Sequence, residues 1–143
     1  TDAFQEGYWR MSIAAIRAWL GDNLATISGL RVAETIPDNP SPPIAILSLS
    51  NVTYDGASHG GLVQYNFVVS VIVGRVSERT AQARLDTVIS SGTGSVKKAV
   101  ESDKSLGGAA YDVRVSEMSS VGAVQLNDAT YLAADFSIQV YAN

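Results

Sequence analysis

The fold is decided by residues 62–73, which read LVQYNFVVSVIV. Every second residue is apolar, in the order Val63, Tyr65, Phe67, Val69, Val71 and Val73. A period of two held over this length predicts a strand with one face in the core. The residues of the other face are mixed: Gln64, Asn66, Val68, Ser70 and Ile72. We therefore expect this second face to be half covered, by helices or by a neighbouring subunit.

Residues 44–54, just upstream, predict the partner strand of a long β-hairpin. Their first half is apolar and their second half polar, and the glycine-rich residues 55–61 form the tip. A twelve-residue strand is roughly 40 Å long, whereas a compact body of this chain length is about 37 Å across. We expect the hairpin of residues 44–73 to span the body or to project from it. A projecting arm would suit a receiving second chain, because monomers avoid unpaired strand edges; an arm bent over its own domain is the alternative.

Helical patterns lie on both sides of the hairpin in the sequence. Apolar residues spaced by three to five predict a helix over residues 4–24, followed by a short strand over 30–36 and a proline-rich loop over 37–43. After the hairpin, Ser77 is expected to cap a helix through Ile89. Ser95 is expected to cap a second helix, which ends near residue 103.

The C-terminal part of the chain predicts more strands, over residues 111–115, 121–126 and 130–141, with a turn at 127–129. Strands cluster instead of alternating with helices. This order predicts an α+β fold, with a mainly antiparallel sheet packed with an N-terminal helix and a central helix pair, and with a long β-hairpin. No linker divides the chain, so we expect one domain over residues 1–143.

Composition narrows the classes of function. The 143 residues are 46% hydrophobic and only 17% charged, below the roughly 25% charged residues of soluble domains, which suggests that partners cover some surface. The net charge of −4 argues against a nucleic-acid reader. Cysteine is absent and histidine occurs once, so we expect no metal and no cofactor. Neither a membrane span nor a secretory signal is expected, which favours folding in a reducing cytoplasm.

Two segments could carry chemistry, and a structural interpretation is favoured for both. His59 has Ser58 beside it and Asp55 four residues earlier, but a glycine-flanked loop does not hold a base rigidly against a nucleophile. Residues 92–98 put glycines and two lysines at a helix start, where backbone amides could bind an anion. A helix-to-helix turn capped by Ser95 explains them as well. We therefore expect the chain not to be an enzyme.

Several short segments resemble the tail-terminator (tail-completion) proteins of long-tailed actinobacterial phages. The resemblance covers residues 62–143, and the order of elements fits over the full length. The segments that carry it are Val73-Gly74-Arg75-Val76-Ser77-Glu78-Arg79, Leu85-Asp86, Gly94-Ser95-Val96-Lys97-Lys98-Ala99-Val100, Leu106-Gly107-Gly108, Tyr131-Leu132-Ala133-Ala134-Asp135-Phe136 and Val140-Tyr141-Ala142.

The resemblance implies a homo-hexameric ring in the neck of a virion tail, assembled in the host cytoplasm. Such a ring caps the head-proximal end of the tail tube, ends tube polymerisation and offers a surface for head joining. Its partners would be other copies of the chain, the major tail tube protein and a head-completion or stopper protein. The alternatives are another neck ring protein, such as a head-tail connector or stopper, and a small soluble ligand-binding α+β domain or enzyme.

Partner contacts are expected at the hairpin tip and at the last turn. The residues are Asp55, Gly56, Ser58, His59, Gly60, Gly61, Gln125, Asn127 and Asp128. Genomic DNA would pass through the ring without specific binding. We expect a neutral to negative lumen, because basic side chains would hold DNA through its phosphates.

Overall fold

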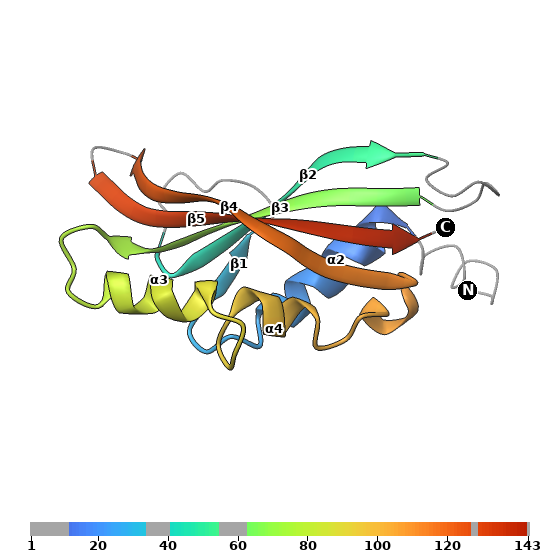
Figure 1. The fold of residues 1–143 in the computed structure, drawn as a ribbon, viewed down its shortest axis with the longest axis horizontal. Helices are drawn as coiled ribbons and strands as arrows, with labels where there is room; N and C mark the ends of the chain where they lie inside the picture. Colours follow the sequence, from blue (N-terminus) through green and yellow to red (C-terminus); the bar gives the residue numbers. More distant parts are fainter. Residues whose placement is uncertain (1–11, 34–40, 55–62, 127–128, 143) are drawn as a thin grey trace.

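Five strands form one mixed sheet in the computed structural model, which describes residues 12–33, 41–54, 63–126 and 129–142 (Figure 1). The strands, in sheet order, are β1 (Arg31–Ala33), β2 (Ile44–Thr53), β3 (Val63–Arg75), β5 (Ala129–Ala142) and β4 (Asp112–Leu126). β1 pairs with β2 in parallel, and the other pairs are antiparallel. The predicted α+β fold with a mainly antiparallel sheet is confirmed.

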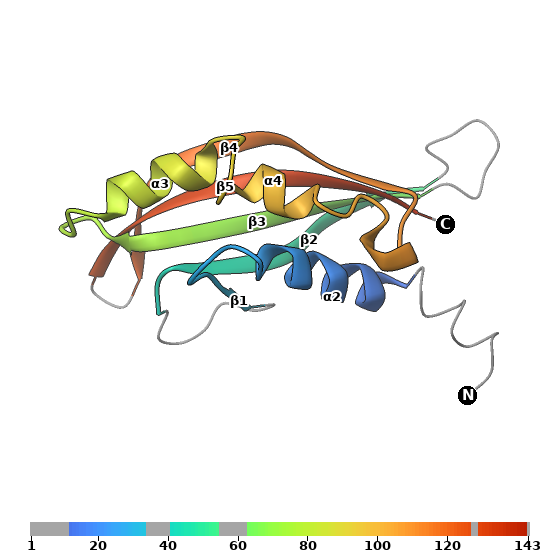
Figure 2. The same ribbon diagram turned by 90° about the horizontal axis from the view of Figure 1, so that it is seen from below.

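The helices lie together on one face of this sheet (Figures 1 and 2). They are α2 (Ile13–Leu24), α3 (Ala81–Ile89), α4 (Val96–Val100) and the short 3-10 helix η1 (Leu106–Gly108). The architecture therefore has two layers: helices on one side, and on the other a sheet face that no described helix covers.

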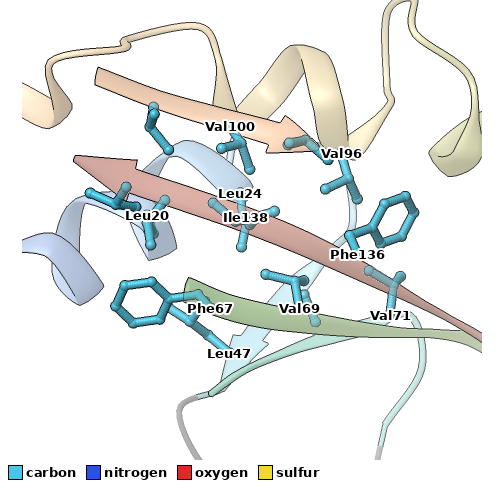
Figure 3. Packing of buried hydrophobic residues seen from close by; sticks show 14 of the residues in the cluster. Leu20, Leu24, Leu47, Phe67, Val69, Val71, Val96, Val100, Phe136 and Ile138 are labelled. Atoms are coloured by element: carbon cyan, nitrogen blue, oxygen red, sulfur yellow. The ribbon is translucent and has the colours of Figure 1, made fainter. Parts of the chain in front are cut away.

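The main core lies between these layers, and the alternating residues of β3 form its centre (Figure 3). Phe67, Val69 and Val71 are at most 1% exposed and pack against apolar side chains of β5 and of the helices. On the opposite face of β3, Ile72 is buried, whereas Val68 and the polar residues are partly exposed. For the described residues 63–73 the expected core face is confirmed. The other face is half buried, but no described helix covers it, and its covering by a neighbouring subunit stays a prediction.

The described strands of the hairpin, residues 44–54 and 63–73, span the body and do not project as an arm (Figure 1). β3 is paired along its length on both sides, by β2 and by β5. The pairing reaches Val63, which lies opposite Ala142, so the far end of the hairpin is still inside the sheet. A projecting arm is wrong for the described strands of the hairpin. The tip, residues 55–62, lies outside the described residues.

The starts of α2 and α3 differ from the sequence prediction. Ser12 has extended backbone and caps α2, its Oγ accepting a hydrogen bond from Ala15 N at 3.1 Å. A continuous helix over residues 4–24 is therefore wrong at Ser12, and residues 1–11 lie outside the described residues. α3 begins at Ala81 and not after Ser77, because Val76 N still donates to Thr130 O of β5 at 3.0 Å. The chain therefore stays hydrogen-bonded to the sheet as far as Val76, which is too late for a helix that starts directly after Ser77.

The strands predicted over residues 111–115 and 121–126 are one strand, β4. Residues between them lack an apolar alternation, which is why the sequence predicted a break. β5 pairs with β4 along its whole length. The pairing register shifts twice, between Val115 and Glu117 and between Met118 and Ser120.

A tight connection leads the chain from α4 to the start of β4. Leu106, Gly107 and Gly108 all have positive φ, at 49°, 66° and 96°. The Asp103 carboxylate holds this turn by accepting hydrogen bonds from Ser105 Oγ and from Gly107 N, both at 2.8 Å. These hydrogen bonds lower the pKa of Asp103 below its ordinary value.

The buried side chain of Asn23 links α2 to the end of α4 and to the connection that follows it. Its side-chain amide donates to Val100 O at 3.2 Å and to Asp103 O at 3.5 Å. The two carbonyls lie at the end of α4 and just beyond it, where helical carbonyl oxygens lack partners within the helix. The position of α4 over the sheet is therefore fixed from α2.

Candidate assembly surface

The outer edge of β4 is the most exposed regular element that the structure describes. β4 lies at the end of the sheet, so one side of its backbone has no strand partner among the described residues. Residues 116–125 are ten consecutive exposed residues, and we call this segment the open edge. Monomers normally blunt such edges, because unpaired N–H and C=O groups bind other strands.

Apolar side chains add to the exposure of the open edge. Met118, Val121 and Val124 are 36%, 48% and 38% exposed, three of the seven large hydrophobic residues exposed in the described part of the chain. Lysine, arginine and proline, the residues that most often protect an edge, are absent from the open edge, and Glu117 is its one charged residue. The side chains of the open edge therefore give it little protection against strand pairing.

The other sheet edge differs, because β1 is only three residues long. The first part of β4 differs too. Val113 and Val115 are buried, 0% and 8% exposed, under the helix layer. β1 pairs only with Ile44, Ala45 and Ile46, so residues 47–53 of β2 also lack an outer strand partner in the described part of the chain. The open edge differs from them by its ten consecutive exposed residues.

The helix-free sheet face carries an uncharged polar network near the end of the β2–β3 hairpin. Gln64 Nε2 donates to Asn66 Oδ1 at 2.9 Å, and Asn66 Nδ2 donates to Asn51 Oδ1 at 2.6 Å. On β5, Tyr141 OH donates to Gln139 Oε1 at 3.1 Å. These side chains carry no charge and are hydrogen-bonded to one another.

The same face is apolar at its other end. A second small core there consists of Ile44, Ile46, Ile72, Tyr131 and Ala133, with Ala33, Leu126 and Ala129 packed against it. Register places this cluster beside the far end of β4, since Val124 lies opposite Tyr131 and Gly122 opposite Ala133. The open edge therefore borders an apolar patch of the sheet.

Most of the predicted contact residues lie outside the described residues. These are Asp55, Gly56, Ser58, His59, Gly60, Gly61, Asn127 and Asp128. Gln125 is described: it is exposed, pairs with Thr130 and is the last residue of the open edge. The sequence analysis missed the rest of the open edge. The available signal was the non-alternating run at residues 116–120 within a strand of the sheet.

The described residues offer little for chemistry. They contain no group of three or more histidine, aspartate or glutamate side chains placed to hold a metal, and none of their helices is long and apolar enough to span a membrane. A hollow of about 600 Å³ is mostly apolar and is lined by the α2–β1 connection and by α3. Ser95, within the glycine-lysine segment, caps α4 by accepting from Lys98 N at 3.1 Å, as predicted.

Glu101 closes the edge of β4 just before the open edge begins. Its Oε2 accepts hydrogen bonds from Val115 N at 2.9 Å and from Lys97 Nζ at 2.8 Å. Burial raises the pKa of Glu101, but the hydrogen bonds from Lys97 and Val115 and the charges of Lys97 and Lys104 outweigh it, so the pKa lies below its ordinary value of 4.5. Asp112 and Arg114 face the same polar hollow of about 330 Å³.

The lowered pKa predicts a stability change in acid. Because folding lowers the pKa of Glu101, its contribution to stability is complete above pH 4.5 and is lost as the pH falls through the folded-state pKa. We expect the free energy of unfolding, measured with urea, to fall with pH in this range, and less steeply in Glu101→Gln. Asp103 titrates in the same direction and retains part of the slope. An unchanged slope in the variant would contradict this assignment.

Twenty-seven chains of solved structures are similar to this chain, and two of them follow. A solved structure of a protein known only by a sequence identifier is 16% identical with a TM-score of 0.45, covering 91% of this chain and 96% of that chain. A chain in the virion of a native gene transfer agent (GTA) particle is 18% identical with a TM-score of 0.37, covering 92% of this chain and 100% of that chain.

One structural neighbour of the chain thus belongs to a virion particle. At these TM-scores we base no functional step on either likeness. No protein-family model matches the chain. No curated protein matches it either.

Proposed function

We propose that the chain is a structural subunit of a phage-like virion and works as a tail terminator. Six copies would form a ring on the head-proximal end of the tail tube, end tube polymerisation and offer the surface for head joining. The open edge of β4 is the observation that carries this proposal: ten exposed residues with an unpaired backbone and three exposed apolar side chains. The resemblance of residues 62–143 to tail-terminator proteins supports it.

The physics of assembly suits such a subunit. A ring forms when a heterologous contact, made between two different surfaces of neighbouring copies, closes on itself. The open edge supplies one such surface, and its low charge lets copies approach without repulsion. A tube grows by repeating one contact, so a ring with one matching face and one different face ends the series.

The proposal assigns the chain no catalytic step and no cofactor. Its partners are other copies, the major tail tube protein and a head-completion or stopper protein, in the neck of the virion. Genomic DNA passes through the ring without specific binding. The neutral to negative lumen stays a prediction, which a ring with Lys97, Lys98 or Arg84 crowding its channel would contradict.

Electron microscopy of particles that lack the protein tests the proposal. Overlong tube polymers together with unjoined heads are the expected result, because nothing would end the tube or bridge it to the head. Tails of normal length with unjoined heads would assign the chain to the alternative class, a connector or stopper. Normal, infectious particles would contradict both functions.

A further inference from the structure

We propose that Glu101 is a register stop for strand addition between copies: it closes the edge of β4 at Val115, so a second copy of this chain can pair only with the open edge beyond it. This inference rests on the proposed function. It deepens that function by stating where the contact between copies begins and which side chain sets that limit.

The Glu101 carboxylate occupies the donor that an incoming strand would need. Strand addition extends a sheet through the outward N–H and C=O groups of its edge. At Val115 the N–H already donates to Glu101 Oε2 at 2.9 Å, and Lys97 Nζ holds the same oxygen at 2.8 Å. A hydrogen bond to an ionised acceptor is stronger than one between neutral groups, so a neutral backbone carbonyl does not readily replace the carboxylate.

The position of Glu101 is rigid enough for this role. Glu101 is the C-cap residue of α4, and Val96 and Val100 anchor that helix in the core, each 0% exposed. Asn23 of α2 fixes the end of α4 through Val100 O at 3.2 Å. The carboxylate therefore meets Val115 from a helix that is held at two places.

The exposure of β4 changes at the residue that Glu101 binds. Val115 is buried, and from residue 116 onward every residue of the open edge is exposed. The register shift between Val115 and Glu117 falls at the same point. In the part of the chain that the structure describes, no further side chain on the helix layer bonds the β4 backbone beyond Val115.

A second copy is the occupant that the open edge fits best. Its one charged residue, Glu117, gives two copies little repulsion, and its exposed apolar side chains lose contact with water when a neighbouring copy covers them. A strand that paired without a stop could slide along β4 by two residues at a time, because the side-chain period is two. A closed ring needs a single register, and Glu101 removes the registers that include Val115.

Amide hydrogen exchange on isolated and assembled copies tests the stop. In the wild type, we expect Val115 to be protected in both states, and residues 116–125 to gain protection only on assembly. In Glu101→Ala, Val115 of isolated copies should exchange at least about tenfold faster. On assembly of this variant, Val115 should become protected, because pairing now extends across it. Glu101→Gln keeps an acceptor, and Lys97→Ala keeps the carboxylate, so both should leave Val115 protected in isolated copies.

The outcomes separate the two proposals. If Val115 in assembled Glu101→Ala stays as fast as in isolated copies, the stop is wrong, while protection of residues 116–125 would still support assembly through the open edge. If those residues gain no protection in assembled wild type, the proposed role of the open edge fails. If Glu101 has only a structural role, Val115 of the alanine variant should exchange fast in isolated and in assembled copies.

Cross-linking keeps the stop testable if Glu101→Ala does not fold. The chain contains no cysteine, so a single introduced cysteine can carry a photoreactive benzophenone maleimide, which links to whichever surface of the neighbouring copy lies against it. Ser120 and Arg114 lie on the same face of β4, on either side of the boundary. We expect Ser120→Cys to cross-link copies and Arg114→Cys not to do so. Equal cross-linking at both positions would overturn the stop.

Discussion

Val121→Lys is expected to abolish assembly of the chain while leaving the free energy of unfolding within about 0.5 kcal/mol of the wild-type value. Val121 is 48% exposed in the middle of the open edge, so the isolated fold loses little packing. A lysine on an edge strand is a device by which proteins prevent strand pairing, because its ammonium would have to be desolvated between two chains. Native mass spectrometry and incorporation into particles measure the effect.

Val76→Lys is the matched control for this prediction. Val76 is 47% exposed and lies after β3, outside the open edge. The control makes the same chemical change at equal exposure, so a general effect of added charge would appear in both variants. Assembly of Val121→Lys at the wild-type level would contradict the assignment of the open edge, whatever the control does.

Gly107→Ala is expected to destabilise the fold by about 2–5 kcal/mol, from a left-handed backbone that disfavours a side chain and from overpacking. Gly107 has φ 66°, and a Cβ there would lie 2.5 Å from Trp19 Cε2 and 2.8 Å from Trp19 Cη2. The indole belongs to α2 and the glycine to the connection into β4, so a shift of either disturbs the helix layer. Urea unfolding measures the loss.

Alanine substitutions at two other glycines distinguish the cost of the left-handed backbone from the cost of overpacking. Gly29 also has positive φ, 78°, but nothing lies within 4 Å of a Cβ there. Gly29→Ala should therefore show the backbone cost alone, about 1–2 kcal/mol. Gly92→Ala, with open space and no positive φ, should change stability little. A loss in Gly107→Ala no larger than in Gly29→Ala would show that Trp19 does not confine this position.

The central strand could be predicted from the sequence because burial and period agree there. Every second residue from Val63 to Val73 is apolar, and strands pair with both edges of β3, so this pattern identifies the residues of the core. Ser95 was predictable for a similar local reason: a serine directly before an apolar helical turn caps it, as it does for α4. Such features depend only on neighbours in the sequence.

The continuity of β4 depends instead on its partner. Residues 116–120 carry no strand pattern of their own, and they are extended because β5 pairs with them despite two register shifts. The start of α3 was mispredicted for a related reason, since the Val76 hydrogen bond to Thr130 O prolongs the sheet past β3. A single sequence does not record pairing between segments that are far apart.

The candidate surface was harder to predict than the fold. Sequence reasoning favoured the loop tips at residues 55–61 and 127–128, because glycine and polar residues mark exposed turns. The open edge became recognisable only from the strand order, which puts β4 at the end of the sheet. Glu101 gave no signal either, because its partner Val115 is fourteen residues away and is a backbone amide.

Electron cryomicroscopy of the neck of the assembled particle tests the central claim most directly. The claim is that this chain acts through contacts between its copies, made along the open edge. It predicts six copies in a closed ring, with residues 116–125 of each copy paired to its neighbour and with Val115 still bonded to Glu101. A ring in which residues 116–125 face solvent, or a particle neck without this chain, would contradict it.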